Sequence, residues 1–219
     1  RGWRAATIYG THADARSLLP DSDCLRFDGR SSQVDLPGQD VDLSQGLTLE
    51  AWVYFSGSPR DNEVLIALGG GSVGTSLLLW RDHAADRFVI SVGRAPTLDS
   101  LRFALPRKAD SWLHLAITID ASRNVVVWQH GDFLANGTLS STDTRSIWTE
   151  IRSRLGKGLD SNNPFQGRMT EVRLWKQVRL NTQIFTTRSQ RALGSEAGLV
   201  LHYPLNDGWG TVVGDKNRP

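Results

Sequence analysis

Alternating apolar and polar residues run along positions 112–120 and constrain the fold more than any other feature of this sequence. Every second residue from Leu113 to Ile119 is leucine or isoleucine, and a period of two is that of a β-strand with one buried face. Turn-forming residues follow at 120–124, a second apolar run occupies 125–129, and His130-Gly131-Asp132 follows as another turn. The pattern predicts consecutive antiparallel strands joined by tight reversals.

Similar short runs recur along most of the chain. We expect extended segments at residues 24–27, 33–36, 47–55, 64–68, 75–80, 88–92, 101–105, 112–119, 125–129, 133–139, 151–155, 167–175 and 199–203. A dozen or so strands with frequent turns indicate an all-β sandwich or jelly roll. Only residues 179–190 look helical, and there we expect a turn or two with Asn181 as N-cap and with Ile184 and Phe185 facing inward.

Composition narrows the class of protein. The 219 residues, 39% of them hydrophobic, suffice for one large core, and a β-sandwich of this length is usually one domain. Cys24 is the sole cysteine, so the core or a bound ion, and no internal disulfide, must hold the fold. No apolar run approaches the roughly 20 residues of a membrane helix, and the first residues lack a signal peptide's apolar segment. The net charge of +2 does not indicate a partner that is nucleic acid or membrane.

Five pieces of sequence, in order, carry a family resemblance: Leu25-Arg-Phe-Asp-Gly29, Val34-Asp-Leu36, Leu47-Thr-Leu-Glu-Ala-Trp-Val53, Trp112-Leu-His-Leu-Ala116, and Phe165-Gln-Gly167 with Glu171-Val-Arg-Leu-Trp175. Together they resemble laminin G-like jelly-roll domains of the concanavalin A-like lectin and glucanase group. The resemblance covers roughly residues 24–205 and implies a jelly-roll sandwich of two antiparallel sheets, one of them concave. Residues 198–217 look like the opening of a following unit in a tandem array. We therefore expect residues 1–219 to be a single unit of a larger multidomain protein.

Basic residues outnumber acidic ones eight to three between positions 145 and 179. The basic residues are Arg145, Arg152, Arg154, Lys157, Arg168, Arg173, Lys176 and Arg179. This excess predicts an anion-facing surface, in which arginine can bind sulfate or carboxylate through two hydrogen bonds. For an anionic glycan, we expect Arg152, Arg154, Lys157 and Arg168 to contribute the charge. Ordinary solvent-facing strand positions are the alternative.

The tryptophans divide by their sequence context. Trp52, Trp112 and Trp175 lie in alternating strands, where the resembled family keeps large core aromatics, and we expect them to pack in the core. Trp148 and Trp209 lie in polar or glycine-rich stretches. Such side chains can stack on a sugar ring or anchor a protein interface, and the alternative is that each packs under a loop.

Oxygen-bearing side chains gather at two expected turns. Asp28 precedes a glycine, and Asp160, Asn162 and Asn163 lie close together in one loop. Oxygen ligands in a turn are what calcium requires, so these four residues are a candidate calcium site. The alternative is that they form turns by bonding their own backbone.

No pattern for catalysis is evident in the sequence. Glycosidases of the resembled fold share a Glu-x-Asp-x-Glu strand, which this sequence lacks, and its five glutamates are isolated from one another. Asp40 and Asp42 are two residues apart but flank an expected turn. In the resembled family an acidic pair commonly falls at Thr170-Glu171, and here threonine replaces the first carboxylate, which weighs against a calcium site at that position. Cys24 opens an expected core strand, and no Gly-x-Ser-x-Gly elbow occurs.

These observations favour a noncatalytic recognition module that binds carbohydrate or a protein surface within a larger secreted protein. A structural or assembly domain of a large extracellular or toxin-like protein, in contact with neighbouring domains of the same polypeptide, is the alternative. A glycosidase is a third and weaker hypothesis. The triplet Asn136-Gly137-Thr138 also matches the N-glycosylation sequon.

Overall fold

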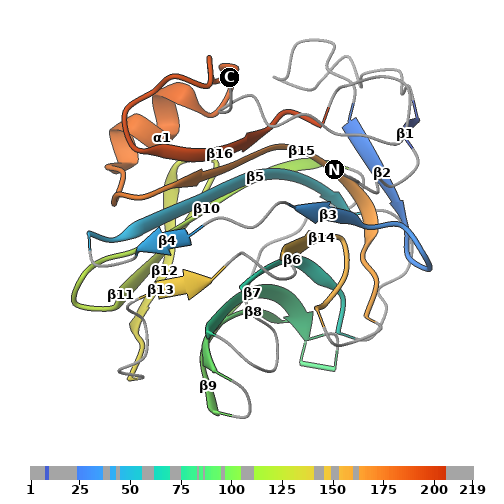
Figure 1. The fold of residues 1–219 in the computed structure, drawn as a ribbon, viewed down its shortest axis with the longest axis horizontal. Coiled ribbons are helices and arrows are strands. Elements are labelled where there is room, and N and C mark those ends of the chain that lie inside the picture. Colours follow the sequence, from blue (N-terminus) through green and yellow to red (C-terminus); the bar gives the residue numbers. More distant parts are fainter. Residues whose placement is uncertain are drawn as a thin grey trace.

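Two antiparallel sheets form the described part of the chain (Figure 1). The computed structural model describes residues 8–9, 24–36, 40–42, 45–55, 62–69, 75–82, 84–85, 87–94, 97–104, 111–140, 146–148, 153–159 and 163–205. Among these residues the larger sheet has eight strands, with β16 (Leu199–Tyr203) beside β15 and the others in the order β1 (Ile8–Tyr9), β2 (Cys24–Asp28), β15 (Gln166–Trp175), β5 (Leu47–Phe55), β10 (Trp112–Ile119), β11 (Asn124–Gln129) and β12 (Asp132–Thr138).

The smaller sheet packs against one face of the larger sheet. Its six strands in the described ranges are, in order, β3 (Val34–Leu36), β14 (Ser153–Leu155), β6 (Val64–Gly69), β7 (Thr75–Asp82), β8 (Arg87–Arg94) and β9 (Thr97–Phe103). A two-stranded ribbon of β4 (Asp40–Asp42) and β13 (Ser146–Trp148) accompanies them. One apolar core draws on both sheets, for example on Leu49 and Ile90. The protein is an all-β jelly-roll sandwich, as the sequence predicted.

The strand boundaries follow the sequence pattern best where a strand buries one apolar face. β10 spans the expected 112–119, and every second residue from Leu113 to Ile119 lies in the core between the sheets. The expected strand at 101–105 is instead β9, which begins at Thr97 and ends at Phe103. The sequence did not predict β1, β4 and β13, because strands of two or three residues are too short to show a period.

The outer face of the larger sheet, which is turned away from the smaller sheet, is also partly covered. The helix α1 (Asn181–Thr187) lies over this face (Figure 1). We call residues 178–198, which include α1, the cap. Because of the cap, β5 is buried on both faces from Leu47 to Val53: Thr48, Glu50 and Trp52 face outward and are as inaccessible as the core-facing residues between them.

The helix differs from its prediction in two respects. The N-cap is Leu180 and not Asn181, because the chain is still extended at Leu180 and the side chain of Gln183 accepts a hydrogen bond from the Leu180 N–H at 2.8 Å. Ile184 is buried as expected, but Phe185 is 50% exposed. The guanidinium of Arg188 lies 3.7 Å from the centre of the Phe185 ring, so this ring packs along the surface of the cap.

The three tryptophans expected in the core lie instead on the outer face. Trp52 and Trp175 are buried, as predicted, but beneath the cap and not between the sheets. Trp112 is only half-buried. Cys24, in contrast, is buried in the strand where it was expected.

The backbone at Gly156 passes so close to the Phe27 ring that there is no room for a side chain at this position. Its φ is +78°, and a Cβ at this position would lie 2.1 Å from the ring of Phe27. We expect Gly156→Ala to lower the free energy of unfolding by about 1–3 kcal/mol, because a left-handed alanine and an overfilled core are both unfavourable. Urea denaturation would measure this loss. Phe27→Leu removes the ring that the new Cβ would meet. The double variant should therefore lose less stability than the sum of the two single losses, and simple additivity would contradict the contact.

Candidate functional site

Four side chains from four adjacent strands form a row across the outer face of the larger sheet. Arg168 of β15 lies opposite Arg26 of β2 on one side and opposite Tyr54 of β5 on the other, and Tyr54 lies opposite Trp112 of β10. These side chains point outward because the residues that precede or follow them along each strand face the core. With neighbouring strands about 4.8 Å apart, the row is roughly 15 Å long. We call these four residues the aromatic-arginine row.

The members of the aromatic-arginine row contact one another. The guanidinium carbon of Arg168 lies 5.1 Å from the centre of the Tyr54 ring, a cation–π distance. The rings of Tyr54 and Trp112 meet edge to face with their centres 5.7 Å apart. Arg26 is exposed, and the other three side chains are half-buried. The row therefore presents aromatic surface at one end and positive charge at the other.

The cap covers the next pair of residues along the same strands. Trp52 lies opposite His114, with the ring centres 5.2 Å apart, and both side chains are buried. The indole N–H of Trp52 donates a 2.7 Å hydrogen bond to the carbonyl of Arg188 in the cap. The aromatic-arginine row thus lies on the same face as this covered pair, two residues further along each strand.

Glu50 is the first centre of an ionic network beneath the cap. Its Oε1 lies 2.5 Å from Nη1 of Arg179, and its Oε2 lies 3.5 Å from Nε2 of His114. Arg179 also donates to the hydroxyl of Thr187 at 2.9 Å, and its backbone N–H donates to the hydroxyl of Thr48. Glu50 thereby joins the start of the cap to the centre of the sheet.

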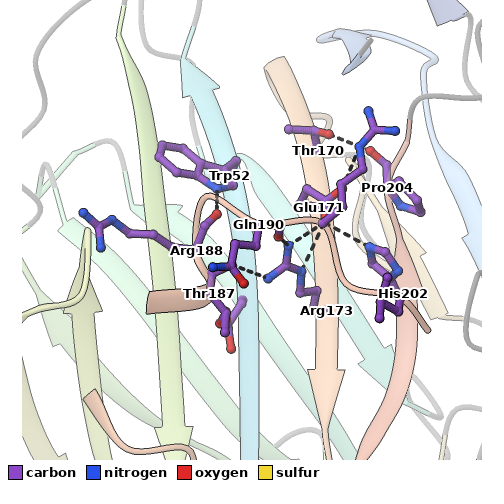
Figure 2. A network of polar contacts seen from close by, with 12 residues as sticks. Trp52, Thr170, Glu171, Arg173, Thr187, Arg188, Gln190, His202 and Pro204 are labelled. Carbon is purple, nitrogen blue, oxygen red and sulfur yellow. Dashed lines mark hydrogen bonds and ion pairs between the residues drawn. The ribbon is translucent and has the colours of Figure 1, made fainter. Parts of the chain in front are cut away.

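Glu171 is the second centre of this network (Figure 2). It is buried at a β-bulge with a φ of 51°, and its Oε2 lies 2.6 Å from Arg173 and 3.0 Å from His202. Arg173 in turn donates to the backbone carbonyl of Thr187 at 3.0 Å and to that of Gln190. Figure 2 shows how Arg173 connects the β15 strand to the cap.

The network favours charged glutamates and a neutral histidine. Burial raises the pKa of Glu50, but the hydrogen bond to His114 and the charges of Arg179 and Arg173 outweigh it, so the pKa lies below its ordinary value. Burial likewise opposes the contacts of Glu171 with His202 and Arg173, and these contacts also bring its pKa below the ordinary value. Burial lowers the pKa of His114, and the charges of Arg173 and Arg188 add to the effect against the opposing pull of Glu50.

The sequence matches a known family over most of its length. A laminin G model of the concanavalin A-like lectin/glucanases superfamily matches residues 28–185. The chain belongs to this family. The matched part of this laminin G-like domain contains Tyr54, Trp112 and Arg168 of the aromatic-arginine row, and Arg26 lies two residues before it. No curated protein sequence matches the domain.

Solved structures share the fold of this laminin G-like domain at low sequence identity. A candidate carbohydrate-binding protein from Bacteroides ovatus matches with a TM-score of 0.66 and 19% identity, over 88% of this chain and 56% of its own. The binding domain of Paraclostridial Mosquitocidal Protein 1 matches with a TM-score of 0.62 and 12% identity, over 84% of this chain and 46% of its own. The chain thus spans about half the length of these two structures.

A third structure is that of a single domain. Domain 4 of AbnA, an extracellular arabinanase of Geobacillus stearothermophilus, was solved in complex with arabinotriose. It matches with a TM-score of 0.58 and 17% identity, over 85% of this chain and 82% of its own. At these identities the three structures show the jelly-roll fold and nothing finer.

The basic residues predicted to form one surface are divided between different places in the laminin G-like domain. Arg173 and Arg179 are buried beneath the cap, which contradicts both an anion-facing surface and an ordinary solvent-facing position for them. Arg154 lies in the smaller sheet, where its Nε donates to Asp35 at 2.6 Å. Lys157 is half-buried in the turn that follows β14. Of the four predicted glycan contacts, Arg168 alone is in the aromatic-arginine row; Arg152 lies outside the described residues.

The rings of the two tryptophans predicted to bind ligand, Trp148 and Trp209, lie outside the described part of the structure. Trp148 lies in β13, where it pairs with Asp40, but its side chain is outside the description. Trp209 lies wholly outside the described residues. Asn136, the acceptor of the glycosylation sequon, is exposed on β12 at the edge of the larger sheet.

The chain next to Asp28 lies beside the chain that follows Asn163. The Gly29 N–H, next to Asp28, donates a 3.1 Å hydrogen bond to the carbonyl of Phe165, and the carbonyl of Asn163 accepts from Val64 at 3.0 Å. Asp160 and Asn162 lie outside the described residues. In the described part of the chain, no three His, Cys, Asp or Glu side chains gather into a metal site.

Asp28 is engaged within its own turn. Its Oδ1 accepts hydrogen bonds from the N–H groups of Arg30, Ser31 and Ser32 at 2.8–3.0 Å, and its Oδ2 accepts one from the Ser31 hydroxyl. Slight burial raises the pKa of this carboxyl, but the hydrogen bonds hold it far below its usual range. This is the turn-forming role that the sequence left open beside calcium, and a calcium site here remains a prediction.

Proposed function

We propose that this laminin G-like domain is a noncatalytic carbohydrate-binding module and that sugar binds on the aromatic-arginine row. The observation that carries the proposal is the row itself: two adjacent aromatic rings and two guanidiniums on a half-open strip of a rigid sheet. An aromatic ring stacks on the apolar face of a pyranose, and arginine bonds its oxygen atoms. The domain would act as a recognition unit of a larger secreted protein.

The state of the buried glutamates supports the noncatalytic part of the proposal. A glycosidase needs a carboxyl group with a raised pKa as its general acid and a second carboxylate close by. Glu50 and Glu171 lie beneath the cap, each beside an arginine, and their pKa values are shifted downward. Both are therefore ionised at neutral pH and serve as anchors for the cap.

Two of the structurally similar proteins support the choice of carbohydrate. One is described as a candidate carbohydrate-binding protein, and the other, an arabinanase domain, was solved with arabinotriose. Neither likeness identifies the sugar that this chain binds, since the identities are 19% and 17%.

A glycan array tests the proposal. We expect the purified chain to bind at least one glycan class, and we expect Trp112→Ala to weaken that binding by about tenfold or more, because stacking of an aromatic ring is lost. Phe133→Ala is the matched control, since Phe133 is an exposed aromatic residue on β12, outside the row. Reducing-sugar assays on every bound glycan should show no hydrolysis. The proposal would be contradicted if the chain bound no glycan on the array, or if it hydrolysed one that it bound. A chelator arm tests the calcium prediction separately.

A domain that contacts its neighbours in the same polypeptide is a second candidate function. It is favoured by exposed apolar side chains on the cap, namely Leu180 at 64%, Phe185 at 50% and Leu193 at 84%. Hydrogen exchange of residues 178–198 should then be slower in the full-length protein than in the isolated chain. Equal exchange in both would count against this candidate.

A further inference from the structure

The aromatic-arginine row runs across the strands of the larger sheet. Trp112, Tyr54 and Arg168 are successive partners on three neighbouring strands, β10, β5 and β15, and Arg26 of β2 continues the line. Neighbouring strands are about 4.8 Å apart, and this spacing is close to the length that one sugar ring adds to an extended chain. A saccharide that lies along the row would therefore place one ring over each strand.

The open strip is long across the strands but narrow along them. On the side of the cap, the next outward residues of the same strands are Thr170, Trp52 and His114, and each is at most 2% exposed. On the other side, β10 begins at Trp112 and β5 ends one residue after Tyr54. In the described β10 and β5, the row thus holds the only outward residues that a ligand can reach. A strip of this shape fits a single unbranched chain.

The two aromatic rings of the row are inclined to each other. The planes of the Tyr54 and Trp112 rings differ by 60°, and the ring centres are 5.7 Å apart. A crystalline polysaccharide face is flat, so aromatic rings that stack on it have to lie in one plane. Two inclined rings instead suit a single chain in which each sugar ring is turned relative to the one before it. The angle therefore favours a soluble chain over a crystalline surface.

Contacts within the row hold this geometry before a ligand binds. The guanidinium carbon of Arg168 lies 5.1 Å from the centre of the Tyr54 ring, and Tyr54 in turn meets Trp112 edge to face. All three side chains are half-buried, so a chain that matches the row would bind with little further loss of side-chain freedom. At the end opposite Trp112, the N–H groups of Arg168 can donate to sugar hydroxyls. A ligand should thus gain affinity until it is long enough to reach from Trp112 to Arg168.

We infer that the aromatic-arginine row binds an internal stretch of a single, soluble, unbranched polysaccharide chain, with successive sugar rings over Trp112, Tyr54 and Arg168. The inference rests on the proposed function and names its ligand class. A lone terminal sugar would occupy only one of the three positions. A crystalline face could not lie flat on both aromatic rings at once.

Chain-length series test this assignment by calorimetry. The probes are xylo-, manno-, arabino- and β-1,3-gluco-oligosaccharides of one to six sugar residues. In at least one series we expect the affinity to rise by about tenfold or more from the monosaccharide to the trisaccharide, and to change little for longer chains. In sedimentation with crystalline cellulose or crystalline chitin, the domain should stay in solution.

Variants at the two ends of the row test the direction in which the chain lies. Trp112→Ala should weaken binding at every chain length, because the stacking of a sugar ring is lost. Arg168→Gln should weaken binding of the trisaccharide about threefold more than that of the disaccharide, the effect of one lost hydrogen bond that only the longer chain can form. Arg102→Gln is the matched control, since Arg102 is an exposed arginine on β9 of the other sheet, and it should leave every affinity unchanged.

The outcomes separate this inference from the proposed function. A monosaccharide that binds as tightly as its trisaccharide, or sedimentation of the domain with a crystalline polysaccharide, would overturn the single-chain class and leave a carbohydrate module in place. An effect of Arg168→Gln that is equal at every chain length would do the same, and so would binding to a glycan of the array but to none of the four series. No carbohydrate binding at all would instead defeat the proposed function.

Discussion

Replacing Arg173 with leucine should lower the free energy of unfolding by about 3–5 kcal/mol, the usual cost of removing one partner from a buried ion pair. Arg173 is 2% exposed and contributes to two sites at once. Its guanidinium neutralises Glu171, and it donates to cap carbonyls, among them that of Thr187 at 3.0 Å. Leucine fills part of the volume but leaves a charged glutamate and backbone oxygens without these donors.

Urea denaturation of the variant and of the parent chain measures this loss. Arg102→Leu provides the control, because an exposed arginine on β9 should matter by less than about 0.5 kcal/mol. Hydrogen exchange should also rise in residues 178–198, since Arg173 holds the cap to β15. The double variant with Glu171→Leu should be less destabilised than the sum of the single losses, because it removes the stranded charge as well. An Arg173→Leu chain as stable as its parent would show that the network does not hold the cap.

The sequence revealed the sandwich because the core depends on a local pattern. Apolar residues at every second position of β10 have to face one side, and that side is the interior. The pattern says nothing of a second covering layer, so the sequence analysis assigned Arg173 to an anion-facing surface and treated Glu50 only as an isolated glutamate. Trp52 was the available signal: a large aromatic among the outward residues of β5 indicates that something covers that face.

The aromatic-arginine row could not be read from the sequence for a different reason. Its members lie at positions 26, 54, 112 and 168, and they become neighbours only through the register of four strands that are distant in the chain. Sequence reasoning singled out Arg168 from local charge and placed Trp112 in the core, and it selected neither Arg26 nor Tyr54. Charge counting also joined Arg173 to Arg168, although the bulge of β15 and the cap place one beneath the cap and the other in the half-open row.

Acidification should destabilise the domain in two steps, through the same buried network. The pKa of His114 lies below its ordinary 6.5 in the folded protein. At a pH between the folded and the unfolded pKa, His114 is protonated in the unfolded chain and neutral in the folded one. The contribution of His114 to stability is therefore full above pH 6.5 and declines as the pH falls below it. The pKa values of Glu50 and Glu171 lie below their ordinary 4.5, so their contribution is full above pH 4.5 and is lost as the pH falls further.

The geometry explains why the first step belongs to histidine. Nε2 of His114 faces Glu50, and Nδ1 has no hydrogen-bond partner among the described residues, so a second proton would be buried without an acceptor. The surrounding groups are Glu50 on β5, Arg173 on β15, Arg188 of the cap and His130, whose own pKa is lowered by burial and by His114. Each pKa unit between the folded and unfolded states is worth about 1.4 kcal/mol.

Urea titrations at pH 7.5, 5.5 and 4.0 would resolve both steps. We expect stability to fall from pH 7.5 to 5.5 and again from pH 5.5 to 4.0. His114→Gln should flatten the first step and leave the second. His130→Asn is the control, because asparagine tolerates the left-handed backbone of this turn, with a φ of 53°, while removing the other half-buried titrating ring. If stability is constant down to pH 5.5, or if His130→Asn alone removes the first step, then the buried His114 is not the group that senses the pH.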